Sequence, residues 1–311
     1  MKILVFGKDG QLGKAFKAQF DQLIPTFENK PAIKYVGRHE CDLSNADAIS
    51  TLLNQIQPDL IVNASAYTAV DKAEIEVDLA YAINAMAPEI MAQYAVENNS
   101  TLLHYSTDYV FDGEKDGFYL EDDLRSPLGI YGKSKAAGEE AIVSLFSSGN
   151  TGRYAILRTS WVYGEGSNFI RTILRLAKER EELKIIADQY GVPTSANWLA
   201  IMSLSLALNQ QGTLKTFPSG IYHAVPGGET TWHGLATLAA QSALEAGVIL
   251  KVQPAAIQPI PALEYPLPAP RPMNSRMSTD KLQAILTQTK FPYWEGGVRD
   301  YVFRLSADGL I

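Results

Sequence analysis

The chain begins M-K-I-L-V-F-G-K-D-G-Q-L-G at Met1–Gly13, and Lys14–Leu23 follows with the periodicity of a helix. Lys2–Phe6 is a short apolar run, which is typical of a buried parallel strand. A strand, a glycine-rich turn and a helix in this order are the start of a dinucleotide-binding fold. Glycines let the backbone approach a pyrophosphate, and a helix N-terminus favours negative charge. The spacing is G-x-x-G-x-x-G rather than G-x-G-x-x-G, so a plain tight turn is the alternative.

Further apolar runs alternate with helical patterns up to about residue 160. The expected strands are Ile33–Val36, Leu60–Val62, Leu102–Tyr105 and Tyr154–Leu157. This alternation predicts an α/β fold, a doubly wound parallel sheet of the Rossmann type, with a smaller C-terminal α/β substrate domain. We expect a cofactor domain at 1–160, with segments returning from about 195–250, and an interleaved substrate-binding domain at 161–311.

The second half has a different character. Helical patterns occupy Asn168–Glu179, Asn197–Leu208, a stretch ending near Leu244, and Thr279–Thr287, and Gly220–His223 has the pattern of a strand. Residues 254–272 hold seven of the sixteen prolines. This segment is either a linker or an irregular loop that wraps the smaller domain, and the helical pattern after it favours the loop.

Composition excludes several classes of protein. The 311 residues carry a net charge of -7, so the basic surface that binds nucleic acid is absent. The single cysteine, Cys41, rules out an internal disulfide or a cysteine-based zinc site. The N-terminus starts directly with a strand pattern, and we find no run of 18 apolar residues. We therefore expect a cytoplasmic protein without a membrane segment.

Candidate cofactor residues gather after the first three predicted strands. The second strand ends in Gly37-Arg38, where an NAD-binding fingerprint has an acidic residue. A cation suits a 2′-phosphate, so we expect NADPH, with NADH possible and a plain surface charge as the alternative role of Arg38. The full expected set is Gly7, Asp9, Gly10, Gln11, Leu12, Gly13, Arg38, Asp42, Leu43, Ala64, Ala66, Tyr67, Tyr131 and Lys135.

Tyr131 and Lys135 are four residues apart in a helical pattern, so they share one face of the helix. An ammonium beside a phenol lowers the pKa of the phenol, which would make Tyr131 a proton donor near neutral pH. Thr107 ends the fourth strand and is placed to hydrogen-bond the same substrate oxygen. Alone, the Y-x-x-x-K pattern is weak, and a solvated helix face is the ordinary alternative.

Longer motifs narrow the interpretation. They are S-T-D-Y-V-F-D-G at Ser106–Gly113, S-P-L-x-x-Y-G-K-S-K-x-x-G-E at Ser126–Glu139, R-T-S-W-V-Y-G at Arg158–Gly164, D-Q-Y-G-V-P-T at Asp188–Thr194 and R-P-M-N-S-R at Arg271–Arg276. Together with the glycine turn they resemble the extended short-chain dehydrogenase/reductase family, and within it the dTDP-4-dehydrorhamnose reductase family. The resemblance spans nearly the whole chain.

The resemblance implies a reaction and roles. NADPH or NADH would reduce the C4 ketone of dTDP-4-dehydro-β-L-rhamnose to dTDP-β-L-rhamnose, the last step of dTDP-rhamnose biosynthesis for cell-wall polysaccharide. The catalytic residues would be Thr107, which orients the carbonyl, Tyr131, which gives the proton, and Lys135, which lowers the Tyr131 pKa and holds the nicotinamide ribose.

A dTDP-sugar substrate would meet Thr107, Asp108, Tyr109, Trp161, Asn168, Arg271 and Arg276. Guanidinium groups suit the diphosphate, because they form paired hydrogen bonds with phosphate oxygens. Trp161 is either a wall of the sugar pocket or a core residue. Asn168 is either a substrate contact or a helix N-cap.

One departure from the family concerns metal. Some members bind magnesium through acidic residues soon after the third glycine and after D-Q-x-G-x-P-T. Here Lys14-Ala15 and Ala196-Asn197 occupy these places, and the four histidines lack metal-ligand spacing. We therefore expect no metal, regard magnesium as doubtful, and expect a monomer or a weak homodimer.

Two other functions remain open. A sugar-nucleotide dehydratase or epimerase of the same fold needs further acid and base groups, and Asp108-Tyr109 stands where dehydratases carry Asp-Glu. A non-catalytic, NADP-binding regulatory subunit would have no need for Thr107, Tyr131 and Lys135 together.

Overall fold

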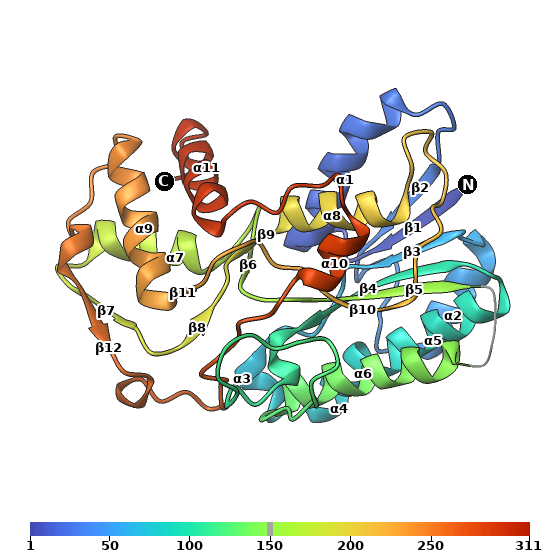
Figure 1. The fold of residues 1–311 in the computed structure, drawn as a ribbon, viewed down its shortest axis with the longest axis horizontal. Helices are drawn as coiled ribbons and strands as arrows, with labels where there is room; N and C mark the ends of the chain where they lie inside the picture. Colours follow the sequence, from blue (N-terminus) through green and yellow to red (C-terminus); the bar gives the residue numbers. More distant parts are fainter. Residues whose placement is uncertain (148–151) are drawn as a thin grey trace.

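In the computed structural model, which describes residues 1–147 and 152–311, the main sheet has six parallel strands in the order β10-β5-β4-β3-β1-β2 (Figure 1). The strands are β1 (Lys2–Phe6), β2 (Ala32–Val36), β3 (Leu60–Asn63), β4 (Thr101–Thr107), β5 (Arg153–Thr159) and β10 (Gly220–His223). Their apolar runs are buried, as expected for a parallel sheet with both faces covered. The predicted α/β fold with a doubly wound parallel sheet is confirmed.

Helices cover both faces of this sheet. On one face lie α1 (Gln11–Leu23) and α8 (Ala196–Ala207), and on the other lie α2 (Ala46–Ile56), α5 (Ala87–Glu97) and α6 (Ile130–Phe146). After residue 70 the chain is helical as far as Glu97: the short α3 (Val70–Ala73) is followed by α4 (Val77–Tyr81), which continues through a π-helical turn, η2 (Ala82–Met86), directly into α5. Short 3-10 turns are η1 (Ile24–Thr26), η3 (Asp108–Val110), η4 (Pro254–Ala256) and η5 (Ala262–Glu264).

A second lobe is built around α7 (Phe169–Glu179), α9 (Trp232–Glu245) and α11 (Trp294–Ala307), which share one apolar core (Figure 1). Three two-stranded pairs complete it: β7 (Leu183–Ile186) with β12 (Ile257–Ile260), β8 (Tyr190–Gly191) with β11 (Thr230–Thr231), and β6 (Val162–Tyr163) with β9 (Thr194–Ser195). The proline-rich segment thus contributes a strand, β12. The short α10 (Asp280–Ile285) packs back onto β10 in the main lobe.

The chain crosses between the lobes several times. The segments α8 and β10 pack in a core of the first lobe, whereas α9 packs in the core of the second lobe. Across the described residues, the helices are too short or too polar to span a bilayer.

The order of the strands places a ligand site at the carboxyl ends of the central strands. The chain moves outward from β1 to β2 and then crosses back to β3 on the other side of β1. Such switch points open a crevice at the carboxyl ends of the strands, and ligands bind there in open α/β sheets. Gly7 follows β1 with φ +85°, and a Cβ at this position would lie 2.7 Å from the Ala64 carbonyl after β3. The close approach of these two turns therefore requires glycine.

Candidate active site

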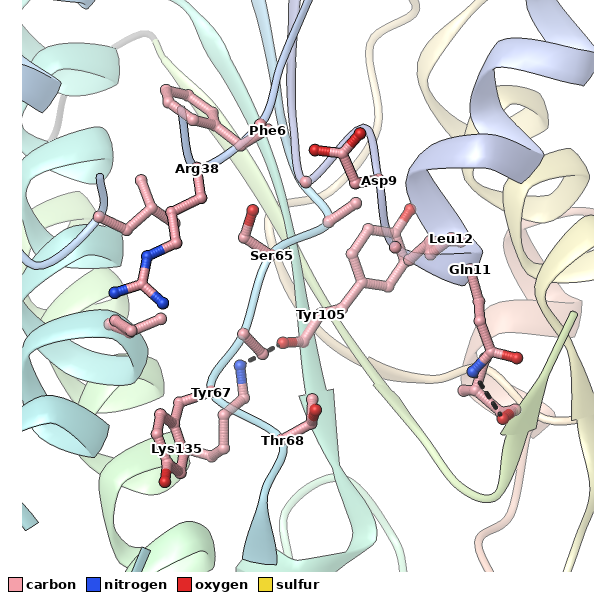
Figure 2. A pocket seen from close by; sticks show the side chains of 18 of the residues that line it. Phe6, Asp9, Gln11, Leu12, Arg38, Ser65, Tyr67, Thr68, Tyr105 and Lys135 are labelled. Carbon is pink, nitrogen blue, oxygen red and sulfur yellow. Dashed lines mark hydrogen bonds between the residues drawn. The ribbon is translucent and has the colours of Figure 1, made fainter. Parts of the chain in front are cut away.

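A cavity of about 640 Å³ lies over the carboxyl ends of β1, β2, β3 and β4, at the switch point (Figure 2). Its volume is in the range of small-molecule and cofactor sites. Of the fourteen expected cofactor residues it is lined by thirteen: Gly7, Asp9, Gly10, Gln11, Leu12, Arg38, Asp42, Leu43, Ala64, Ala66, Tyr67, Tyr131 and Lys135. Gly13 instead packs under the turn, where a Cβ would lie 2.0 Å from the Gly7 carbonyl oxygen.

The glycine turn presents the start of α1 to this cavity. The Gly10 amide donates to the Gly7 carbonyl at 3.0 Å and closes the turn. Gly10 is also the N-cap of α1, and no side chain caps the helix there. The first N–H groups of a helix have no partner within the helix and carry partial positive charge. This end of the cavity is therefore suited to the pyrophosphate of a dinucleotide.

Arg38 supplies a positive charge at the end of β2. Its side chain is 74% exposed, and Figure 2 shows it at the cavity. Its Nε lies 3.8 Å from the Asp42 carboxylate, which already accepts hydrogen bonds from the Ser44 amide and hydroxyl. Such a distant, exposed pair leaves the guanidinium free to meet another anion.

Lys135 and Tyr131 project from α6 toward the cavity, but they do not hydrogen-bond each other among the described contacts. The Lys135 Nζ donates to the Tyr105 carbonyl at 2.6 Å and lies 3.2 Å from His104 Nε2 (Figure 2 shows the first of these). The Tyr131 ring meets the Tyr109 ring edge-on at 5.5 Å between centroids.

The expectation that Lys135 lowers the Tyr131 pKa is wrong for this structure. Burial raises the pKa of Tyr131 to about 12, and the smaller opposing effect is a hydrogen bond with Thr107. Burial also lowers the pKa of Lys135 to about 8, with the nearby Glu139 carboxylate acting in the opposite direction. Desolvation disfavours both charged forms, and the ammonium is turned to Tyr105 and His104 rather than to the phenol.

Thr107 is tied to a buried carboxylate. Its hydroxyl donates to Asp108 Oδ1 at 2.9 Å and accepts from the Tyr109 amide at 3.2 Å. The Ser275 hydroxyl, from the R-P-M-N-S-R motif, donates to the other oxygen of Asp108. Asp108 is only 2% exposed, and burial raises its pKa to about 6 despite these hydrogen bonds.

Two further hydroxyls in the cavity have no partner. Ser106 Oγ and Thr159 Oγ1 are buried at the ends of β4 and β5, line the cavity, and make no hydrogen bond with the described residues. Buried polar groups in native proteins are nearly always paired, so each such group needs an explanation. Together with the glycine turn and Arg38, they fit a bound group that carries phosphates at one end and hydrogen-bonding atoms at the other. A nicotinamide dinucleotide has this character.

Trp161 has a backbone conformation that is rare for a bulky residue. Its φ is +48°, and its ring stacks on Trp232 at 3.7 Å between centroids. Positive φ at a residue other than glycine costs energy and is found preferentially at functional sites. Trp161 is partly buried against the second core, and it does not line the cavity described above. A role as a wall of the sugar pocket stays a prediction.

Asn168 is the N-cap of α7, which confirms one of the two expected alternatives. Its Oδ1 accepts from the Arg171 amide at 3.1 Å, and its Nδ2 donates to the Gly164 carbonyl and the Tyr301 hydroxyl, each at 2.9 Å. These contacts join α7 to α11. A substrate contact by Asn168 stays a prediction.

The two candidate diphosphate arginines are each held by a carboxylate. Arg271 makes a paired contact with Asp71, at 2.7 and 2.9 Å. Arg276 lies 3.2 Å from Glu229 and 5.3 Å over the Tyr190 ring. A diphosphate would have to compete with these carboxylates, so its binding by the two arginines also stays a prediction.

Sequence reasoning missed several residues of this site, among them His104, Ser275, Asp71, Ser106 and Thr159. His104 lies in a strand pattern and gives no sign of its contact with Lys135, which is 31 residues away. Ser275 stands inside a quoted motif, but nothing in that motif pairs it with Asp108. Residues 1–147 and 152–311 contain no group of three or more His, Cys, Asp or Glu side chains that could hold a metal ion.

Comparisons with known proteins identify relatives that match nearly the whole chain. The family model of the RmlD substrate binding domain matches residues 1–307. The dTDP-4-dehydrorhamnose reductase of Salmonella typhimurium is 43% identical over 304 residues, covering 96% of both chains. That of Escherichia coli strain K12 is 41% identical, with the same coverage.

Solved structures give the same result. A dTDP-4-dehydrorhamnose reductase from Clostridium acetobutylicum is similar with a TM-score of 0.85 and 31% identity, covering 98% of this chain and 99% of that one. The enzyme from Bacillus anthracis, in complex with NADP, has a TM-score of 0.83 and 32% identity, covering 97% and 99%. A UDP-glucose 4-epimerase from Thermus thermophilus is 17% identical with a TM-score of 0.77, a likeness of fold alone.

Proposed function

The chain belongs to the family of the RmlD substrate binding domain, and we propose that it reduces dTDP-4-dehydro-β-L-rhamnose to dTDP-β-L-rhamnose with NADPH. The observation that carries this proposal is that Tyr131 and Lys135 line the cavity at the switch point, while Thr107, which does not line the cavity, hydrogen-bonds Tyr131. NADPH is preferred to NADH because Arg38 offers an exposed guanidinium where the 2′-phosphate would lie. We further propose that the enzyme acts in the cytoplasm as a monomer or weak homodimer, without magnesium.

When bound, the nicotinamide cofactor supplies the hydride. Tyr131, whose phenol is protonated at neutral pH, gives the proton to the C4 oxygen. Thr107 lies next to this hydroxyl and orients the carbonyl oxygen. Lys135 faces the cavity beside both groups and holds the ribose of the cofactor.

The dTDP part of the substrate would extend toward the second lobe. We assign the diphosphate to Arg271 and Arg276, which exchange Asp71 and Glu229 for phosphate oxygens. Trp161 and Tyr109 would flank the sugar. Tyr109 already packs against Tyr131, so it links sugar binding to the position of the proton donor.

The test measures NADPH oxidation by absorbance, with the substrate generated in situ and a chelator present. We expect substrate-dependent turnover that survives chelation. Tyr131→Phe should lower kcat by about 10²–10⁴-fold, the usual contribution of general acid catalysis, while the Kd for NADPH stays within a few-fold of wild type.

Other outcomes separate the alternatives. If the wild-type protein binds NADPH but shows no turnover, the assignment fails for this substrate, and a different sugar nucleotide or a regulatory role comes into question. A regulatory subunit would be unaffected by Tyr131→Phe in its binding to a partner. Turnover that is lost on chelation and restored by magnesium would contradict the metal-free site.

A further inference from the structure

His104 is a buried imidazole that the reaction described above does not use. It lies in the middle of β4, is 1% exposed, and makes one polar contact on each ring nitrogen. Nε2 is 3.2 Å from the Lys135 Nζ, and Nδ1 is 3.1 Å from the amide nitrogen of Asn63 on β3. Burying an imidazole without hydrogen-bond partners costs free energy, and these two contacts offset that cost.

We propose that His104 is a positioning residue for Lys135: its Nε2 accepts one N–H of the ammonium and fixes the direction of the other two. The Tyr105 carbonyl accepts the second N–H at 2.6 Å. An ammonium has three donors, so the third remains for the cavity that Lys135 lines. Two fixed acceptors on β4 thus aim the remaining N–H at the cofactor ribose. This inference rests on the proposed reductase function.

The proposal requires a particular proton arrangement. Lys135 has no acceptor as an ammonium, so Nε2 must be bare and Nδ1 must carry the proton. This tautomer requires a half-turn of the Asn63 side-chain amide, which brings its oxygen to Nδ1 and gives up the hydrogen bond that this oxygen accepts from the Ser65 amide at 3.3 Å. Burial and the Lys135 charge hold the pKa of His104 well below its usual value, so the ring stays neutral.

The other charged groups around Lys135 do not replace this acceptor. Glu139, on the same helix, is held by both ends of the Arg158 guanidinium, at 2.9 and 2.7 Å. Asp108 on η3 is engaged by Thr107 and Ser275, and Tyr131 is a neutral phenol. His104 is therefore the neighbouring side chain that stabilises the ammonium directly.

The test compares His104→Leu with His104→Gln, whose amide oxygen can accept the same N–H. Removing the acceptor while Lys135 stays buried lowers the pKa of Lys135, because the charged form loses a hydrogen bond. His104→Leu should therefore shift the alkaline limb of the kcat/KM profile to lower pH by about one unit, since one such unit corresponds to a single charge-assisted hydrogen bond. It should also weaken NADPH binding about tenfold, as measured by fluorescence. His104→Gln should stay within a few-fold of wild type in both.

A role in packing alone would give a different result: His104→Leu would change the melting temperature but leave the alkaline limb in place, and this would overturn the proposal. A measurement on the wild-type protein covers the case in which His104→Leu does not fold. Nitrogen-15 NMR at pH 7 should show His104 with a protonated Nδ1 and a bare Nε2, among only four histidines. A protonated Nε2 would contradict the proposal. Because this spectrum needs no substrate, its failure is distinct from a failure of the proposed reductase function.

Discussion

Tyr131 and Lys135 line the cavity and Asp108 is buried beside Thr107, and burial shifts each of these three groups toward its neutral form. The pKa of Tyr131 rises to about 12, that of Asp108 rises to about 6, and that of Lys135 falls to about 8. Spacing in the sequence shows which side chains share a helix face, but not how much water they lose. The sequence alone therefore could not show that desolvation, and not the Lys135 charge, has the largest effect on the pKa of Tyr131.

Asp108 gives a prediction for stability against pH. Its pKa is raised from about 3.8 to about 6 in the folded protein, so folding favours the protonated form. Stability from this group is complete below pH 4 and is lost as the pH rises through 6, by up to about 3 kcal/mol. Asp108→Asn, which stays neutral, should remove this loss. Urea unfolding at pH 4.5 and 7.5 measures this: relative to wild type, the free energy of unfolding of the variant should be higher at pH 7.5 than at pH 4.5.

A matched control lies four residues away at Asp112. This carboxylate accepts hydrogen bonds from the Glu114 amide and the Tyr119 hydroxyl, and these contacts lower its pKa. A lowered pKa has the opposite effect on stability: the stabilisation that Asp112 contributes is present at neutral pH and is lost in acid. Asp112→Asn should therefore be less stable than wild type at pH 7.5. If both variants respond to pH alike, the burial argument for Asp108 is wrong.

At the scale of elements, α6 carries Tyr131 and Lys135 and is pressed closely against its neighbours. A Cβ at Gly138 would lie 2.1 Å from the Asn84 carbonyl in η2, and one at Gly132 would lie 2.2 Å from the Tyr109 carbonyl. These backbone contacts cannot move aside as side chains can. The π-helical turn at η2 thus packs directly on the catalytic helix, and Asn84 also donates to Ser134 at 3.0 Å.

Gly138→Ala should therefore destabilise the protein by about 1–3 kcal/mol, the usual cost of overpacking. It should also lower kcat, because α6 must shift and take Tyr131 with it. The same change at Gly296 in α11 meets nothing within 4 Å. There the helix propensity of alanine should raise stability by about 0.5–1 kcal/mol. Chemical unfolding and kcat of the two variants test this pair, and a stabilised Gly138→Ala would show that α6 is not tightly packed.

Sequence patterns located the main sheet well, since its strands are short apolar runs next to glycine or polar turns. They did not reveal three features of the secondary structure, namely η2, β12 and α11. The helical region that follows Val70 contains a π-helical turn, η2, in which the Asn84 side chain hydrogen-bonds the backbone of Tyr67. Prolines in 254–272 concealed β12, which tolerates Pro259 because β12 pairs on one side only, with β7. The two adjacent glycines of α11 obscured its helical period, and no element was expected there.

At the scale of the molecule, the two lobes have separate cores but are interleaved by segments of chain that cross between them. Leu199, Met202, Leu204 and Leu206 of α8 are buried in the core on one face of the main sheet. Tyr222 of β10 is 1% exposed in the same core, and β10 pairs with the whole inner part of β5. The Arg271–Asp71 pair ties the C-terminal segment to α3. The cofactor lobe is thus completed by residues that follow the second lobe's first helix.

This interleaving predicts that residues 1–160 do not fold alone. The fragment lacks α8, whose four large apolar side chains contribute about 6–12 kcal/mol of burial. A loss of this size is comparable to the whole net stability of a typical domain, about 5–15 kcal/mol. The fragment also lacks β10, so β5 would become an exposed apolar edge strand, which favours aggregation.

We expect the fragment to show neither a cooperative unfolding transition nor NADPH binding, whereas the full chain should unfold in one transition. Circular dichroism with denaturant and cofactor fluorescence measure both properties. A fragment that melts cooperatively and binds NADPH within tenfold of the full chain would mean that the first 160 residues form an autonomous domain, and that α8 and β10 only cover it.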